Sequence, residues 1–221
     1  MSDFPILTPD GGLTALGYGL CAAAAVLLLL VAGIISRNQK SRLSARQLVF
    51  CGAAMALSFV TSCIKLFSLP YGGSVTLFSM LFICLIGHWY GTRTGILTGL
   101  AYGILQFLQE PYVLSPFQVC CDYILAFAGL GLAGVFAHSR QGLAKGYLLG
   151  ILVRGAFHAL GGYLYWMDYM PENFPQSLTK LYPVIYNYSF ILTEGVLTLV
   201  VLSLPPVKKG LEQIHRLAVE S

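Results

Sequence analysis

Several polar side chains lie inside strongly apolar segments of this sequence, and they are the residues most able to do chemistry. They are Asp122, Arg154, His158 and Glu194, accompanied by the uncharged Gln118 and Asn187. Ionisable groups are costly in hydrocarbon, so inside membrane segments they usually belong to a binding or transport site. Their types fit either recognition of a charged solute or proton transfer between neighbouring groups.

Helical spacing places these residues on shared faces. One stripe repeats every four residues and consists of Arg154, His158, Gly162 and Trp166. Gln118 and Asp122 share a second face, and Asn187 and Glu194, seven residues apart, share a third.

Depth along the helices separates the residues into two layers. At about 1.5 Å per residue, Asp122, His158 and Asn187 lie about 6–12 Å below the outer ends of their helices. Arg154 and Glu194 lie deeper, about 17–18 Å from those ends. Their matched depth suggests an ion pair.

The outer layer combines one carboxylate, Asp122, with aromatic residues. These are Tyr112, Tyr123, Trp166, Tyr182 and Tyr186. Aromatic faces and a single carboxylate suit an organic cation, to which His158 and Asn187 could add hydrogen bonds. Plainer roles stay open. Asp122 could pair with a neighbouring helix, His158 could bond a backbone carbonyl, and Trp166 and Tyr182 could be interfacial belt residues.

The elements that position these groups are expected to be membrane-spanning helices. Apolar residues make up 57% of the 221-residue chain and charged residues only 10%, against about a quarter charged in a soluble domain. The expected spans are Leu13–Ile35, Leu48–Ile64, Val75–Trp89, Thr94–Leu108, Ser115–Ala137, Tyr147–Met167 and Val184–Leu204. The fold class is therefore an all-α integral membrane protein.

Lysines and arginines collect in alternate loops, which predicts the orientation. By the positive-inside rule the N-terminus lies outside and the C-terminus in the cytoplasm. The first span follows two acids and precedes the basic cluster, which fits a retained helix rather than a signal peptide. We expect residues 1–44 to form an accessory helix with a basic linker, dispensable for binding, and residues 45–221 a six-helix binding domain.

Small residues and cysteines have ordinary explanations. Glycines recur every four residues at Gly95, Gly99 and Gly103, and Gly129, Gly131 and Gly134 follow, which favours close helix contact. The six cysteines lie in apolar segments without metal-ligand spacing and are expected to be packing residues, so no metal site is expected.

Four stretches of the sequence resemble the thiamine-specific substrate-binding S-component (ThiT type) of energy-coupling factor transporters. They are the Gly-Gly-Ser loop Pro70–Thr76, Tyr112 with Gln118 and Asp122-Tyr123, His158 with Gly162 and Trp166, and Tyr182 with Asn187 and Glu194. The resemblance covers about Ala45 to Leu204 and implies a six-helix S-component core in a prokaryotic cell membrane.

The resemblance also implies roles for the matched residues. Asp122 would offset the thiazolium charge or bond the aminopyrimidine, and His158 and Trp166 would flank the rings. Tyr112, Tyr123, Tyr182 and Asn187 would close the pocket. The loop Ser68–Ser74 would act as an external lid, and Gly52-x-x-x-Ala56 would contact the shared membrane subunit of the energising module.

The implied partners are thiamine, that transmembrane subunit, two ATPase subunits and the bilayer, with no cofactor and no nucleic acid. The chain departs from the pattern in three places. Asp122 replaces the Glu of some members, Arg154 replaces a Lys, and Leu77 aligns with a second carboxylate.

Two other functions compete with a binding subunit. A stand-alone, ion-coupled secondary transporter could use Asp122, His158, Arg154 and Glu194 as a proton relay, although the halves of the chain show no convincing repeat. An intramembrane enzyme lacks support, since hydrolase, zinc-protease and Cys-x-x-Cys motifs are missing from the sequence. The sequence also lacks a phosphate-binding P-loop, so ATP hydrolysis would come from separate proteins.

Overall fold

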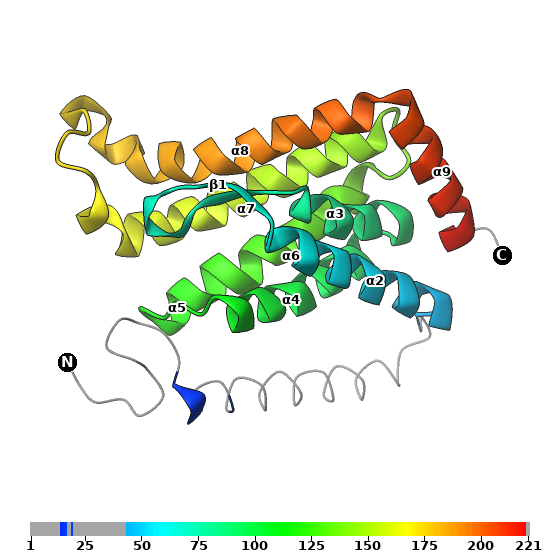
Figure 1. Ribbon diagram of the computed structural model, residues 1–221, viewed down its shortest axis with the longest axis horizontal. Helices are drawn as coiled ribbons and strands as arrows, with labels where there is room; N and C mark the ends of the chain where they lie inside the picture. The colour runs from blue at the N-terminus through cyan, green and yellow to red at the C-terminus, as the bar shows by residue number, and fades with distance from the viewer. Residues whose placement is uncertain (1–13, 17–18, 20–42, 220–221) are drawn as a thin grey trace.

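The computed structural model of the protein describes residues 14–16, 19 and 43–219 (Figure 1). The expected accessory span Leu13–Ile35 lies almost wholly outside these residues. Within them, each of the six spans expected after residue 44 contains a helix, so the all-α membrane fold class is confirmed.

In the described residues, seven main helical segments and a hairpin build the domain. The bounds are α2 (Ala45–Ser62), α3 (Ser79–Tyr90), α4 (Thr92–Gln109), α7 (Gly142–Tyr165), α8 (Tyr182–Ser203) and the C-terminal α9 (Pro205–Val219). Between α4 and α7 runs a composite helix of α5 (Pro116–Val119), the π-helical η2 (Cys120–Leu125), α6 (Ala126–Leu130) and the 3₁₀ turn η3 (Gly131–Phe136). The antiparallel hairpin β1 (Lys65–Ser68) and β2 (Ser74–Thr76) encloses η1 (Pro70–Gly72), and η4 (Met167–Tyr169) and η5 (Gln176–Leu181) precede α8.

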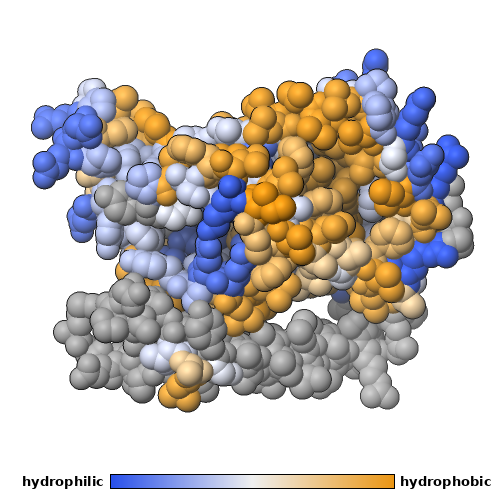
Figure 2. Space-filling model, viewed as in Figure 1, coloured by the Kyte–Doolittle hydropathy of each residue, from blue (hydrophilic) through white to orange (hydrophobic). Residues whose placement is uncertain are grey.

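Several helices are long and apolar enough to cross a bilayer. They are Ala45–Ser62, the composite helix Pro116–Phe136, Gly142–Tyr165 and Gln176–Ser203, while the apolar α3 is shorter, at 12 residues. Figure 1 shows α7 and α8 lying side by side along the molecule. On the visible face of Figure 2, hydrophobic residues form a broad band with hydrophilic residues gathered at both ends, as expected for a bundle in lipid.

Glycines bring α3, α4, η3 and α7 together through their backbones. A Cβ on Gly131 would lie 2.1 Å from the backbone nitrogen of Ile96, and one on Gly146 would lie 2.2 Å from the carbonyl oxygen of Ala133. No side chain larger than hydrogen fits at either position without a backbone shift. The prediction that the glycine repeats serve close helix contact is confirmed here.

One sequence expectation about these elements is wrong. The third span does not begin at Val75, because Ser74–Thr76 pairs with β1, and Phe78, at φ 61°, separates that strand from the start of α3. The fifth expected span is helical from Pro116 to Phe136, although six of its residues form the π-turn η2. Beyond the seventh span, the chain continues as the helix α9.

Candidate functional site

One cavity of about 400 Å³ opens where η2, the end of α7 and the start of α8 face the β1–β2 hairpin. All the residues expected to form a pocket line it, namely Tyr112, Asp122, Tyr123, His158, Gly162, Trp166, Tyr182 and Asn187. They come from four separate parts of the chain. Helical spacing had grouped these residues only within single helices, and the fold brings the groups together around one cavity.

A chain of polar contacts runs along one wall of this cavity. Gln118 Nε2 donates to Asp122 Oδ2 at 2.8 Å, and Asp122 Oδ1 lies 3.2 Å from His158 Nδ1. Arg154 Nε donates to His158 Nε2 at 3.4 Å, and its guanidinium lies 4.3 Å from the centre of the Phe127 ring. Since Nε2 accepts from a permanent cation, the proton of a neutral His158 sits on Nδ1 and points at Asp122.

The position of Asp122 depends on local backbone features that its residue type does not reveal. It lies in the π-turn η2, and π-turns inside helices frequently occur at functional sites. Across the interface, a Cβ on Gly161 would lie 2.8 Å from Asp122 Oδ1. A glycine there lets the carboxylate approach α7 and reach His158.

The ion pair expected between Arg154 and Glu194 is not formed. Glu194 is 3% exposed and accepts from Thr76 N at 2.8 Å and Thr76 Oγ1 at 2.6 Å, with Met80 N and Ser79 Oγ at 3.3 and 3.4 Å. It therefore binds the start of α3, where unpaired N–H groups and the helix dipole favour an anion. Counting residues along the helices placed Glu194 and Arg154 at the same depth in the membrane. It could not show that Thr76, Ser79 and Met80 would donate hydrogen bonds to Glu194 instead.

Two groups of aromatic rings face the cavity. In the first, the centre of the Trp166 ring lies 5.0 Å from that of Tyr112 and 5.1 Å from that of Tyr169. In the second, Tyr186 lies between Tyr182 and Phe190, at 5.8 and 6.2 Å. These separations are typical of interacting aromatic pairs, and all six rings line the cavity.

Two predicted pocket residues have internal hydrogen bonds. Asn187 Nδ2 donates to the carbonyl oxygens of Pro183, at 2.8 Å, and His158, at 3.3 Å, so it ties α7 to α8. A Cβ on Gly162 would lie 2.7 Å from Pro183 Cβ, so this glycine permits the same close approach. Tyr123 donates its hydroxyl proton to the carbonyl oxygen of Glu110 at 2.7 Å.

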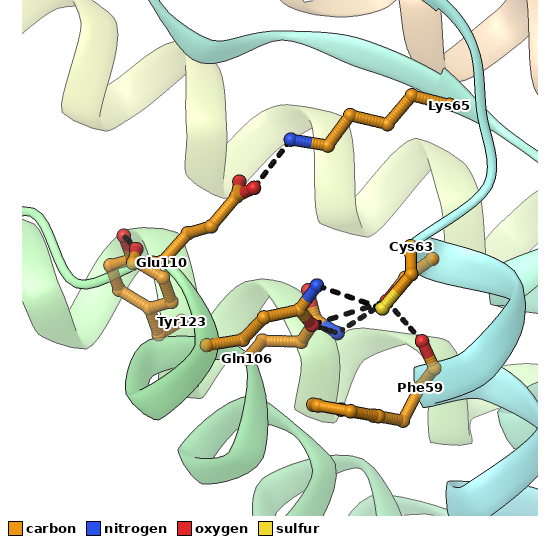
Figure 3. A network of polar contacts seen from close by, with 8 residues as sticks. Phe59, Cys63, Lys65, Gln106, Glu110 and Tyr123 are labelled. Atoms are coloured by element: carbon orange, nitrogen blue, oxygen red, sulfur yellow. Dashed lines mark hydrogen bonds and ion pairs between the residues drawn. The ribbon is translucent and has the colours of Figure 1, made fainter.

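Polar residues at the cavity mouth were missed by the sequence reasoning. Lys65 on β1 and Glu110 at the end of α4 form an ion pair across the opening, and both line the cavity (Figure 3). Beside them, Gln106 Nε2 donates to Ser62 Oγ at 3.0 Å. The sequence signal is that Lys65 and Glu110 lie just beyond the outer ends of two expected spans, Leu48–Ile64 and Thr94–Leu108.

The hairpin is also held on its other side. The Tyr186 hydroxyl donates to the carbonyl oxygen of Pro70, and a Cβ on Gly73 would lie 2.7 Å from Phe190 Cδ1. The loop that joins β1 to β2 therefore lies directly against the second aromatic group.

The charge of the cavity suits a monovalent cation. Its charged lining residues are the carboxylates Glu110, Asp122 and Glu194 and the cations Lys65 and Arg154, which leaves one net negative charge with His158 neutral. Among the described residues, no group of three or more His, Cys, Asp or Glu could hold a metal ion. An organic monocation would neutralise the site, and its flat rings could lie against the aromatic groups.

The residues expected to dock a membrane partner lie elsewhere, on the outer side of α2. Gly52 and Ala56 are both exposed. A Cβ on Gly52 would meet no described atom within 4 Å, so internal packing within the described part of the chain does not explain this pair.

Comparison with known proteins gives a consistent result. The chain is 31% identical to the thiamine transporter ThiT of Bacillus subtilis (strain 168) over 170 residues, which cover 71% of this chain and 85% of that protein. It is 26% identical to ThiT of Lacticaseibacillus paracasei over 69% of this chain and 81% of that protein.

A solved structure of ThiT from Listeria monocytogenes shares the fold. The TM-score is 0.55 at 23% sequence identity, and the match covers 73% of this chain and 93% of the solved one. The family model described as "Thiamine transporter protein (Thia_YuaJ)" matches residues 48–213, which include the whole candidate site. The chain belongs to this thiamine transporter family.

Proposed function

We propose that the chain is the thiamine-binding subunit of an energy-coupling factor transporter and that thiamine occupies the cavity lined by Asp122, His158 and Trp166. The observation that carries this proposal is a cavity with one net negative charge, in which a carboxylate faces two groups of aromatic rings. Thiamine is a permanent cation with two flat rings, so it matches this chemistry, and family membership points to the same substrate.

Within this proposal Asp122 supplies the compensating anion. An organic cation that leaves water for a low-dielectric site is strongly disfavoured without one. Gln118 and His158 hold the two carboxylate oxygens, and the carboxyl is preorganised because its partners are already in place. Trp166 and Tyr112 then offer aromatic surface to the cation.

The loop Ser68–Ser74 is proposed as the external lid of this site. It lies between β1 and β2, and Gly72 has φ 103°, which favours glycine. The Lys65–Glu110 ion pair and the Tyr186 hydrogen bond to Pro70 hold it from the solvent-exposed side, while Thr76 at the far end of β2 is fixed to the buried Glu194. Exposed contacts around the loop, beside a fixed strand end, suit a segment that opens to admit a ligand.

Energy for uptake would come from partner proteins. We propose that the exposed Gly52 and Ala56 face contacts the transmembrane subunit of an energising module, which carries two ATPase subunits. Replacing Gly52 with Trp should abolish uptake in vesicles that contain the complete module and leave thiamine binding by the isolated subunit intact. Loss of both would assign the face to the stability of the chain itself.

The proposed orientation has the N-terminus outside, the C-terminus in the cytoplasm of a prokaryotic cell, and residues 1–44 as an accessory unit separate from 45–221. Alkaline phosphatase fused after Ser221 should be inactive. Deleting residues 2–40 should leave thiamine affinity within a few-fold, and complete loss in a folded protein would place that segment in the site.

A stand-alone ion-coupled transporter is the second candidate, favoured by the continuous contacts Asp122–His158–Arg154. The discriminating measurement is thiamine uptake by the purified protein alone in liposomes under a proton gradient. Uptake without partners would replace the proposed mechanism.

The binding proposal is tested with a pair of ligands. Thiamine and a neutral isostere, in which carbon replaces the thiazolium nitrogen, are titrated against the purified protein with tryptophan fluorescence as the readout. Thiamine should bind more tightly by roughly 2–5 kcal/mol, the usual range for a buried charge pair, which is about 30-fold to several thousand-fold. Equal affinities would sink the electrostatic assignment, and no binding of either would sink the substrate.

A further inference from the structure

A second cavity, of about 560 Å³, lies at the opposite end of the bundle. It is bounded by the end of α3, the first turn of α7, the end of α8 and α9, which Figure 1 shows at the C-terminal end of the domain. It shares no lining residue with the proposed thiamine site, so the thiamine proposal does not account for it.

Three basic side chains from two helices line this cavity. They are His88 on α3 and Lys208 and His215 on α9, and the sole carboxylate in the lining is that of Glu212. Within residues 43–219, none of these three basic groups lies within ion-pair distance of a carboxylate. His88 Nδ1 is buried and has no hydrogen-bond partner among the described residues, which is costly unless a ligand supplies one.

The first turn of α7 adds further donors to the same wall. Gln141, Gly142, Leu143 and Ala144 all line the cavity, and α7 begins without a side chain that caps it. The first N–H groups of a helix lack intrahelical partners and carry the positive end of its dipole, so they attract anions. The His88 ring lies close to this turn, since a Cβ on Gly142 would be 3.2 Å from His88 Cε1.

The rest of the lining is mostly apolar, with Ser203 as its polar member. The larger apolar side chains are Leu143, Leu199, Leu202, Leu211 and Trp89, whose ring centre lies 6.0 Å from that of His215. Beside the cavity, α9 leaves Ile214 42% and Leu217 69% exposed, on the same helix as its lysines. Exposed apolar residues and basic residues on one amphipathic helix suit the surface of a bilayer.

We propose that this cavity binds the phosphate headgroup of an anionic phospholipid, with the acyl chains leaving along the leucines of α8. The basic groups and the α7 N-terminus match a phosphate, and the apolar lining matches a tail. Basic pockets between helices at the membrane surface bind anionic headgroups in this way. A free phosphate would use the same donors and leave the leucine wall without a function.

The test uses the full chain in nanodiscs of phosphatidylcholine. The Trp166→Phe background leaves Trp89 as the single tryptophan, because the chain has only two, and Trp89 lines the cavity. Brominated phosphatidylglycerol is then added, and quenching of Trp89 is compared with that by brominated phosphatidylcholine. Phosphatidylglycerol should quench more strongly at equal mole fraction, and native mass spectrometry of the wild type should retain it in preference to phosphatidylcholine.

Matched lysines on α9 separate a defined site from general surface charge. Lys208 and Lys209 are both exposed, but Lys208 lines the cavity and Lys209 does not. A lysine near an anionic surface contributes about 1 kcal/mol, or about fivefold, to lipid binding. Lys208→Gln should therefore weaken the apparent affinity for phosphatidylglycerol by at least about fivefold, and clearly more than Lys209→Gln.

Three outcomes would overturn the proposal. Equal quenching and equal retention of the two lipids would show that the cavity does not select anionic headgroups. Equal weakening by the two lysine variants would assign the effect to surface charge. If millimolar inorganic phosphate or glycerol phosphate relieved the quenching as well as added unbrominated phosphatidylglycerol does, the site would belong to a soluble phosphate.

Discussion

The two halves of α7 use glycine in different ways. Near its start, Gly146 and Gly150 lie against the backbone of Ala133 and Leu130, with no room for a Cβ at Gly146 and only a tight fit at Gly150. Near its end, Gly161 and Gly162 face the side chains of Asp122, Pro183 and Asn187. The first half is a rigid contact between helices, while the second makes room for polar groups beside a cavity. The same residue type therefore supports the scaffold at one end and the site at the other.

The largest effect on stability is expected at Gly146, where the backbone of α7 packs directly against the backbone of Ala133. Gly146→Leu would place Cβ 2.2 Å from the carbonyl oxygen of Ala133, and overpacking a tight contact costs 1–3 kcal/mol or more. We expect at least about 3 kcal/mol because backbone cannot rotate away, seen as loss of folded protein in thermal unfolding in detergent.

The matched control is Gly52→Leu, at an exposed helical glycine with open space around it. Its stability should be unchanged or slightly higher, since leucine favours helix over glycine by up to about 1 kcal/mol. Equal destabilisation by both variants would mean that helix contact through Gly146 is not what holds α7.

At the other half of α7, loss of charge should remove binding without unfolding the protein. Asp122→Asn keeps the shape of the side chain, and thiamine affinity should fall by roughly 2–5 kcal/mol, the range for unpairing a buried charge. Glu110→Gln is the control, since its carboxylate lies at the exposed mouth and already faces Lys65. Calorimetric titration of both variants decides the matter, and affinity that survives in Asp122→Asn would move the cation site away from η2.

At Glu194, loss of the carboxylate should affect the stability of the protein more than its affinity for thiamine. It is hydrogen-bonded to Thr76, Ser79 and Met80, so Glu194→Gln should lower the free energy of unfolding by about 1–3 kcal/mol through imperfectly replaced bonds. Thiamine affinity should fall less than in Asp122→Asn. A larger loss of affinity than of stability would give Glu194 a direct part in binding the cation.

Much of this arrangement was predictable from helical spacing and charge, and the rest depends on contacts between distant segments. Spacing of four placed His158, Gly162 and Trp166 on one face, because α7 is regular from Gly142 to Tyr165. The π-turn at Asp122 and the partners of Glu194 could not be predicted this way. The partners of Glu194 include Thr76, which lies in a strand at Ser74–Thr76 that forms by pairing with Lys65–Ser68.

The remaining prediction concerns the Lys65–Glu110 ion pair at the opening of the proposed thiamine site. The sequence did not show that β1 would bring Lys65 to Glu110. The pair is partly solvated, with 36% of the Lys65 side chain and 63% of the Glu110 side chain exposed. Exposed ion pairs contribute at most about 1 kcal/mol, so Lys65→Gln should speed thiamine release by less than about fivefold.

The salt dependence of thiamine release shows whether the Lys65–Glu110 pair only holds the hairpin closed or whether one of its side chains contacts thiamine. If the pair only holds the hairpin closed, stopped-flow release rates of wild type and Lys65→Gln should converge near 1 M salt, where the screening length is about 3 Å. Glu110→Gln should match Lys65→Gln, and the double variant should add nothing, because each change removes the same interaction. A difference that persists at high salt, or a double variant slower or faster than both singles, would mean that one of these side chains contacts thiamine itself.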